Sequence, residues 1–257
     1  LGVRIAGPRG HDIKTKNNPA LDWSLPDSHR TTILVQRERL VMFEHERDDA
    51  HYYGSILGTA PLIAQSTGAH EIRLSAAEGD VLEFTIEFMA ARPSAVPTAE
   101  AVFKASGKLW EQFWQSGGAV DFSGSKDPRA AELERRVVLS QYLTAIQLGD
   151  TMPASESGLT TSTWYGKHHT EMVWWHTAHF ALWGRPEFTA RTLGWFQRTL
   201  PVARAIAARR GLQGARWMKM TGPGGRESPG GNPLIVWNQP HAIHLAELLY
   251  RANPTRA

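Results

Sequence analysis

Cysteine is absent from the 257 residues of the chain, so disulfides, thiolate nucleophiles and cysteine-ligated zinc sites are excluded. A long apolar run is also missing, since no stretch approaches the length of about 18 residues that a membrane-spanning helix requires. Neither charge is in large excess, because 28 Lys and Arg against 25 Asp and Glu leave a formal net charge of +3. That excess is too small for the basic surface that nucleic-acid binding requires.

What remains is the composition of a folded globular protein, with 42% hydrophobic and 21% charged residues. We expect no nucleic-acid partner and no membrane span, and the composition leaves open whether the chain forms a homo-oligomer. The N-terminus LGVRIAGPRGHD lacks the order of a signal peptide, and it begins at Leu, as a processed or excised segment would. The compartment, cytoplasmic or exported after processing, stays open.

Residues 1–92 carry the period of two that is typical of strands with one wet face. In VLEFTIEF, residues 81–88, apolar side chains alternate with Glu and Thr, and EIRLS at residues 71–75 alternates in the same way. The connection AAEGD between them predicts a hairpin. RTTILVQRERLVMFEHE and SILGTAPLIA are further strand candidates. These residues therefore predict the C-terminal part of a β-sandwich domain.

Two prolines in AARPSAVPT mark a boundary after which the apolar spacing becomes helical. We predict a linker with a helix at residues 93–125 and a helical domain at 126–257. In the linker, an apolar stripe that includes Phe103, Leu109 and Phe113 is typical of a helix packed against a core. Start and stop signals bound the other predicted helices, which are expected from residue 129 to Gly149, at 167–183, from 187 to Gly211 with an interruption at Pro201, and at 240–251.

The segment WYGKHHTEMVWWHTAHFALWGRPE, residues 164–187, concentrates tryptophan, histidine and glutamate in a window that is predicted to be helical. At 100° per residue both faces of such a helix mix polar and aromatic side chains, whereas a face that packs in a core would carry Leu, Ile and Val. Buried indole and imidazole groups need hydrogen-bond partners. The segment therefore predicts a binding site or a solvated cleft.

The long connections around this segment have the same character. The loop at residues 214–242 is too long for a simple connection in a compact domain, and it carries two tryptophans. Aromatic faces stack on the C–H faces of sugar rings, and polar side chains satisfy the hydroxyls. We therefore predict a site for a small carbohydrate or glycoside, while any single tryptophan could instead pack in a core. The expected binding residues are Trp164, His168, His169, Glu171, Trp175, His176, Trp217, Lys219, Gln239 and His241.

Several motifs in this half resemble the catalytic domain of glycoside hydrolase family 65, a family of disaccharide phosphorylases and hydrolases. The stretches GLTTSTWYGKHHTEM, WGRPE, LPVARAIAARRGLQGARWMKM and QPHAIHLAELLY follow the order and spacing of that family's blocks over residues 158–250. The chain is similar still more closely to an uncharacterised bacterial branch of six-hairpin glycosidases, in which FSGSKDPRAAELERRVVLSQYL and WYGKHHTEM are characteristic.

The resemblance implies a fold of the α+β class, with a partial β-sandwich, a linker helix and part of an (α/α)6 barrel. It also implies inverting chemistry at a sugar's anomeric carbon, in which an acid protonates the leaving oxygen and water or phosphate attacks from the opposite face. His169 stands where the family has a sugar-binding Asp, and Thr170 and Glu171 match its Thr-Glu. Gln239 and His241 match a Glu-x-His. No cofactor and no metal ion is implied.

The family's catalytic acid lies beyond the position of Ala257. Six helical hairpins would need about 250 residues, more than residues 126–257 supply, so we expect a truncated barrel. Within the chain, Glu171 and Glu227 are candidate acids because they are carboxylates in the aromatic region. The Asp-to-His exchange at His169 removes the basis for assuming α-glucose specificity. The sugar, its linkage and the choice between hydrolysis and phosphorolysis stay open.

Two alternatives come from the residues themselves. A metal-dependent hydrolase would use His168, Glu171 and His179, or His169 with His176. The signal for it is weak, because residues seven apart on a helix stand about 10 Å apart along the axis, too far for one ion. A non-catalytic carbohydrate-binding or interaction module would keep the aromatic cleft without the acid.

Overall fold

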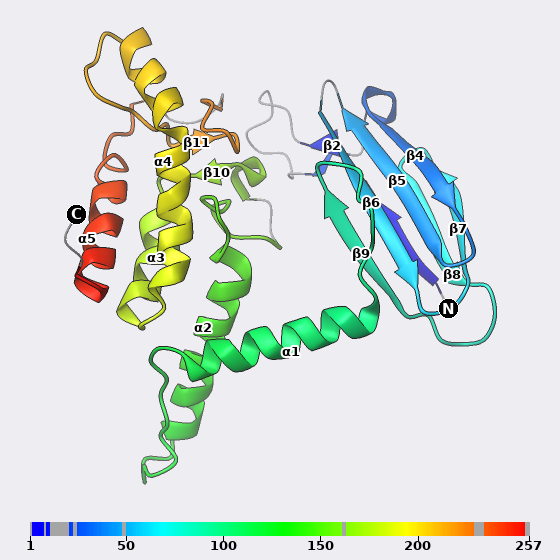
Figure 1. Cartoon of the computed structure of the whole chain (residues 1–257), viewed down its shortest axis with the longest axis horizontal. Helices are drawn as coiled ribbons and strands as arrows, with labels where there is room; N and C mark the ends of the chain where they lie inside the picture. The colour runs from blue at the N-terminus through cyan, green and yellow to red at the C-terminus, as the bar shows by residue number, and fades with distance from the viewer. Residues whose placement is uncertain are drawn as a thin grey trace. The chain divides into compact units, whose positions relative to one another are not determined.

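The computed structural model describes residues 2–7, 9–10, 21–22, 25–47, 50–160, 163–228 and 234–254. The chain divides into two units, Leu1–Gln112 and Phe113–Ala257. Strands make up most of the first unit and helices most of the second (Figure 1). None of the helices in the described ranges combines the length and the apolar character that crossing a membrane requires.

Two antiparallel sheets form most of the first unit, with strand orders β4-β5-β6-β9 and β1-β8-β7. Apolar side chains of both sheets, among them Val41, Ile56 and Leu74, meet in one buried core, which explains the alternation in the sequence. The strands of the first sheet are β4 Arg30–Gln36, β5 Leu40–Arg47, β6 Ala50–Gly58 and β9 Phe84–Met89. The other elements are β1 Gly2–Ala6, β7 Leu62–Gly68, β8 Glu71–Ala76, a short pair of β2 Arg9–Gly10 and β3 Leu21–Asp22, and a 3-10 turn η1 at Pro26–Ser28.

The hairpin predicted between EIRLS and VLEFTIEF is wrong, although a different pair of strands does form a hairpin. β4 and β5 form a hairpin that is closed by reciprocal backbone hydrogen bonds between Arg37 and Leu40. The stretches EIRLS and VLEFTIEF do not pair, because β8 lies between β1 and β7 whereas β9 pairs with β6 in the other sheet. The connection AAEGD therefore carries the chain from one sheet to the other. Local alternation could not reveal this crossing, since it reports which face of a strand is apolar and not which strand is its neighbour.

Helix α1, Ala99–Gln115, confirms the helix predicted in the linker. The prediction that its apolar stripe packs in a core holds at only one end of the helix. Phe113 is 5% exposed, whereas Phe103 is 76% and Leu109 is 55% exposed. The apolar spacing therefore identified the helix correctly but not the extent of its contacts.

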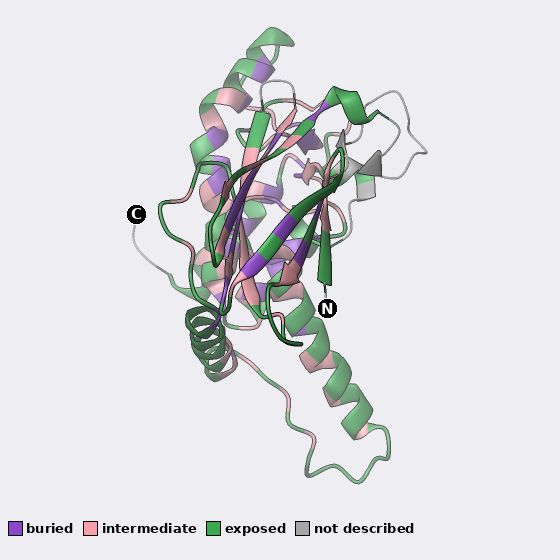
Figure 2. Cartoon of the chain, turned by 90° about the vertical axis from the view of Figure 1, so that its right-hand side faces the viewer, coloured by how far each residue is buried: buried purple, intermediate pink, exposed green. Residues whose placement is uncertain are grey.

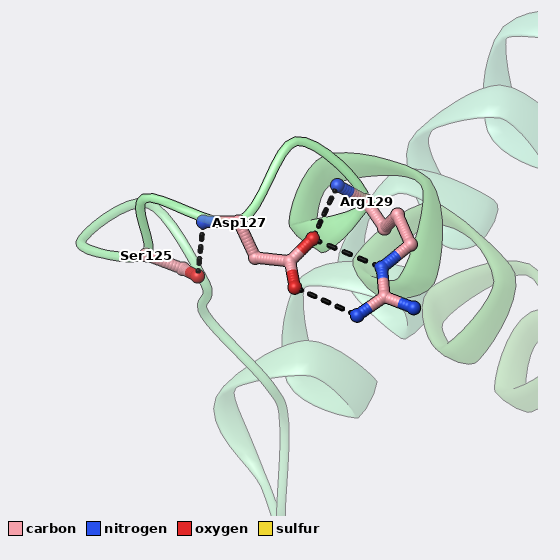
Figure 3. Close-up of polar contacts among 3 residues, drawn as sticks. All are labelled: Ser125, Asp127 and Arg129. Atoms are coloured by element: carbon pink, nitrogen blue, oxygen red, sulfur yellow. Dashed lines mark hydrogen bonds and ion pairs between the residues drawn. The ribbon is translucent and has the colours of Figure 1, made fainter.

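Helix α2, Ala130–Leu148, follows the predicted Asp-Pro start signal and ends before Gly149. The Asp127 carboxylate accepts hydrogen bonds from the backbone and side-chain N–H groups of Arg129 (Figure 3). The Ser125 hydroxyl accepts one from the backbone N–H of Asp127. All of α2 is described and Gln141 is its one buried residue, so most of this helix is exposed (Figure 2).

A buried arginine connects the helices of the second unit at one point. Arg185 is 1% exposed and donates hydrogen bonds to the carbonyl oxygens of Phe113, at 3.0 Å, and Gly118, at 3.2 Å. It also donates to Gln141 Oε1 at 2.8 Å, and its guanidinium carbon lies 4.1 Å from the centre of the Phe113 ring. These partners come from α1, from the connection after it and from α2, so one side chain fixes three segments.

Three further helices pack around a common core in the second unit, with Val173, Trp195 and Leu245 among its buried residues. The predicted interruption at Pro201 is wrong, because one helix continues through it. A proline inside a helix costs one backbone hydrogen bond, and the buried face on both sides, which includes Trp195 and Ile206, outweighs that cost. The three helices are α3 Val173–Leu182, α4 Pro186–Arg209 and α5 His241–Ala252.

The prediction that residues 126–257 form part of a truncated (α/α)6 barrel is also wrong. Such a barrel consists of six helical hairpins, whereas the described residues form five α-helices, of which α3, α4 and α5 share a core. Apolar periodicity identifies a helix and its apolar face, but it does not report how many helices close a ring. The observed fold is of the α+β kind, with two packed antiparallel sheets followed by helices that form no closed barrel.

Candidate functional site

The histidines before α3 lie on a short strand and not on a helix. β10, His168–His169, pairs antiparallel with β11, Met220–Thr221, so the helix predicted from Lys167 is wrong at its start. The hydroxyl of Thr170 donates to the carbonyl oxygen of Met218 at 2.7 Å, which ties the end of β10 to the opposite segment. The helical faces predicted for His168, His169 and Glu171 therefore do not exist, although the strand pair brings other polar residues together.

A mostly buried ion pair lies beside this strand pair. Lys219 Nζ is 2.8 Å from Glu171 Oε2, and their side chains are 12% and 15% exposed. The same ammonium lies 4.5 Å from the centre of the Trp164 ring, as in a cation–π contact. Trp164 follows a left-handed backbone, with φ of 47°, and is 47% exposed. Three of the predicted residues thus meet at the surface.

Glu156 is a fourth member of this group, and the sequence interpretation missed it. Burial raises the pKa of the Glu156 carboxyl, with Lys219 opposing and Glu171 adding to the shift. Its Oε2 atom is buried and makes no hydrogen bond with the residues that the structure describes. Glu156 lies outside the aromatic window, but it follows Ser155, which bridges to His168 of β10. The sequence did contain one signal for Glu156, because a carboxylate stands in the loop that leads into the aromatic window.

His169 faces the same group with an unpaired nitrogen. It is fully buried, and its Nδ1 donates to the carbonyl oxygen of Lys167 at 2.8 Å. Burial lowers the pKa of His169, which keeps the ring neutral and leaves Nε2 as an acceptor. Nε2 is buried and has no partner among the described residues. The region thus presents an unpaired carboxyl oxygen on Glu156 and an unpaired acceptor on His169, both electrostatically coupled to Glu171 and Lys219.

Other predicted binding residues support the backbone. Gln239 is bound at both ends to Trp217, since its Oε1 accepts from the Trp217 backbone N–H at 3.2 Å and its Nε2 donates to the Trp217 carbonyl at 2.7 Å. Trp217 itself packs against the core of the second unit. His241 Nδ1 donates to the Thr170 carbonyl at 3.0 Å. These side chains hold the loop on β10 and the helices.

His176 has a positioning role of the same kind. It is 5% exposed, and its Nε2 donates to the carbonyl oxygen of Glu156 at 3.0 Å. Burial lowers the pKa of His176 to about 4, against the effect of that backbone hydrogen bond. A neutral His176 on α3 therefore fixes the backbone of the residue that carries the unpaired carboxyl group.

Two predicted residues lie apart from this group. Trp175 is 52% exposed and stands edge-on to Trp237, with 5.3 Å between ring centres and 89° between planes. The two rings therefore do not form a flat stacking platform. His168 lines an open hollow of about 490 Å³ between the end of α2 and the following loop, and its Nδ1 donates to the Pro153 carbonyl at 2.6 Å. None of the other nine predicted binding residues lines that hollow.

The remaining candidates lack the predicted arrangement. Glu227 pairs with Arg210 at 2.6 Å, and both side chains are about a third exposed, at 34% and 35%. His179 Nε2 donates to the backbone carbonyl of His176 at 3.0 Å. Within the described ranges, three or more metal-ligating side chains come close enough to share an ion at one place, in the first unit, which does not include the histidines around α3.

No protein-family model and no curated protein matches the chain. The resemblance to glycoside hydrolase family 65 therefore remains a prediction from the quoted motifs. The geometry around Glu171 and Lys219 has to support any functional proposal by itself.

Proposed function

We propose that Glu156, His169, Glu171 and Lys219, with Trp164 beside them, bind a small carbohydrate. The observation that carries this proposal is the pair of unpaired buried atoms, Glu156 Oε2 and His169 Nε2. A native interior rarely leaves such atoms without partners, because each unpaired group costs about 1–3 kcal/mol. A sugar hydroxyl both donates and accepts hydrogen bonds, so it can satisfy either a neutral imidazole nitrogen or a carboxyl oxygen.

The ion pair and the indole extend the same recognition. Glu171 and Lys219 offer a carboxylate acceptor and an ammonium donor in a place that is largely shielded from water. The exposed indole of Trp164 presents an aromatic surface next to them. This mixture of charge-assisted hydrogen bonds and one aromatic ring fits a polar ring compound better than an apolar ligand.

The group also contains the parts that glycoside cleavage requires. Burial raises the pKa of the Glu156 carboxyl group, which favours the protonated form that a general acid requires. In our proposal Glu156 protonates the glycosidic oxygen as the bond to the anomeric carbon breaks. A water oxygen bonds to that carbon, and the Glu171 carboxylate takes the water's proton. The reaction proposed is thus hydrolysis of a small glycoside.

The experiment is a binding and turnover screen of the full chain against 4-nitrophenyl glycosides and disaccharides, with and without inorganic phosphate. Glu156→Gln keeps an N–H donor in place of the acid, so we expect binding to persist and cleavage to fall by about 100-fold or more. Trp164→Ala should weaken binding. Glu227→Gln is the matched control, since its carboxylate lies in an ion pair that is about a third exposed, and it should change neither quantity.

The outcomes separate the two remaining functions. Cleavage that survives Glu156→Gln removes the acid assignment. Binding by the wild-type chain without any cleavage favours a non-catalytic carbohydrate-binding module. Absence of binding to every sugar at millimolar concentration rejects the carbohydrate proposal itself.

A further inference from the structure

Three histidines from distant parts of the sequence meet in the first unit. His45 lies on β5, His29 immediately precedes β4, and His70 lies in the turn between β7 and β8. One ring nitrogen from each lies within 4.8 Å of the corresponding nitrogens of the other two. Since β4 and β5 belong to one sheet and β7 and β8 to the other, the cluster bridges both sheets.

One distance within the cluster matches that between two ligands of a metal ion. His29 Nδ1 and His45 Nε2 are 3.3 Å apart. Two nitrogens that each lie about 2.0–2.1 Å from one tetrahedral zinc ion are separated by about 3.3–3.4 Å. The same distance also suits a weak N–H···N hydrogen bond, so the pair alone decides nothing. The third ring and the hydrogen bonds to the far side of the rings distinguish a metal site from a simple hydrogen bond between two imidazoles.

Those hydrogen bonds fix which nitrogen of each ring carries the lone pair that could bind an ion. His70 Nε2 lies 2.6 Å from the carbonyl oxygen of Pro26, to which it must donate, so the lone pair of a neutral His70 is on Nδ1. The hydroxyl of Thr31 lies 2.8 Å from His45 Nδ1 and 3.2 Å from His70 Nδ1. It can accept from His45 Nδ1, which leaves the lone pair of His45 on Nε2, the atom that faces His29. Its own hydrogen then points to His70 Nδ1, and an ion bound to that nitrogen would replace this hydrogen bond.

The surroundings hold two of the rings and leave the third accessible. His29 and His45 are 9% and 6% exposed, and the Tyr52 ring stacks on His45 with 5.0 Å between centres. His70 is only partly buried, and its ring stacks on that of His29 at 3.5 Å. The lone pairs of two stacked rings lie in nearly parallel planes and do not converge on one point, so binding an ion requires one ring to turn. His70 is the ring that can turn, because it is less buried than the other two.

We propose that His29, His45 and His70 bind one divalent transition-metal ion of the zinc class and that this ion joins the two sheets. Imidazole nitrogens suit zinc, copper, nickel and cobalt better than magnesium or calcium, which prefer oxygen. The three ligands come from three different segments that are far apart in the sequence. The ion would therefore stabilise the folded first unit, because the unfolded chain does not hold the three rings together.

The experiment uses the full chain after treatment with EDTA and removal of the chelator. Titration with Co2+, followed by visible absorption, should give a d–d band that saturates at one equivalent per chain. Zn2+ should displace the Co2+ ion, so that the band disappears. Zn2+ should also raise the melting temperature. His70→Gln should abolish the band and the shift, because it removes one of three ligands, whereas the exposed His51→Gln is the matched control and should retain both.

Thr31→Val tests the orientation of the rings without removing a ligand. Loss of an outer-shell hydrogen bond weakens metal affinity by about 10–100-fold, so we expect a shift of that size in the Co2+ titration. Saturable binding that is equal in His70→Gln, or no d–d band from the wild-type chain, overturns the proposal. If His70→Gln does not fold, an unchanged Co2+ affinity in Thr31→Val also overturns the proposal.

Discussion

The ion pair between Glu171 and Lys219 offers the sharpest test of the proposed site. Replacing Lys219 by Met keeps most of the side-chain volume and removes the ammonium that lies 2.8 Å from the Glu171 carboxylate. The carboxylate then stays in a place where its side chain is 15% exposed, with no cation at that distance. The Trp164 ring also loses the cation 4.5 Å from its centre.

The magnitude follows from distance and burial. Two unit charges 2.8 Å apart attract by about 6 kcal/mol at an effective dielectric constant of 20 and by about 1.5 kcal/mol in bulk water. The cost of desolvating both groups cancels much of that attraction in the intact pair. Removing one partner of a buried pair costs about 3–5 kcal/mol because the other charge is left uncompensated. Partial exposure lowers the expected cost of Lys219→Met to the bottom of that range or slightly below it, at about 2–3 kcal/mol.

The assay is urea unfolding of four chains: wild type, Lys219→Met, Glu171→Gln and the double variant. We expect the double variant to be more stable than the sum of the single losses predicts, since it leaves no unpaired charge. The matched control is Arg210→Met, because the Arg210–Glu227 pair is about a third exposed, at 35% and 34%, and should lose no more than about 1 kcal/mol. Equal losses for Lys219→Met and Arg210→Met would refute the reasoning from burial.

Two further predictions concern buried charges. Arg185→Met should destabilise the chain by about 3 kcal/mol in urea unfolding, because three acceptors lose their donor. Arg185→Lys should not restore the stability, because the single nitrogen of a lysine cannot take the place of the two guanidinium nitrogens that make these bonds. Glu156→Gln should stabilise the chain near neutral pH. The folded-state pKa of Glu156 is raised above 4.5, so the contribution of Glu156 to stability is greatest below pH 4.5 and is lost as the pH rises through the folded pKa. The difference in melting temperature between variant and wild type should therefore widen from about pH 4 to pH 7; a gap that narrows contradicts the sign.

Local patterns predicted the elements better than their connections. The spacing of apolar residues and the flanking Pro and Gly located α2 and α5 within a few residues of their observed bounds and placed α1 in the linker. The same spacing gave a wrong prediction at β10. His168 and His169 were assigned to a helix because the aromatic and polar residues of the helical window follow them without a break. The strand forms because β11, some 50 residues further along the chain, supplies its hydrogen-bond partners. Pairing with so distant a segment leaves no local signal.

The candidate site was predicted in part for the same reason. The window and its loop named Trp164, Glu171 and Lys219, which do meet. Glu156 was missed because its role depends on burial, and burial is a property of the folded loop. Gln239 was assigned to ligand binding from its residue type, yet both of its polar atoms are bound to the Trp217 backbone. Residue type limits the chemistry of a side chain, whereas the fold decides whether its polar atoms remain available.

The histidines show how that availability is decided. A neutral imidazole has one N–H donor and one acceptor, and in His169, His176 and His241 the donor is used on a backbone carbonyl. The function of each ring therefore depends on its second nitrogen. In His169 and His176 that nitrogen is buried without a partner among the described residues, whereas in His45 it faces another imidazole across 3.3 Å. An unpaired buried nitrogen suits a hydroxyl ligand, and a nitrogen that faces another imidazole suits a metal ion, although the residue type is histidine in every case.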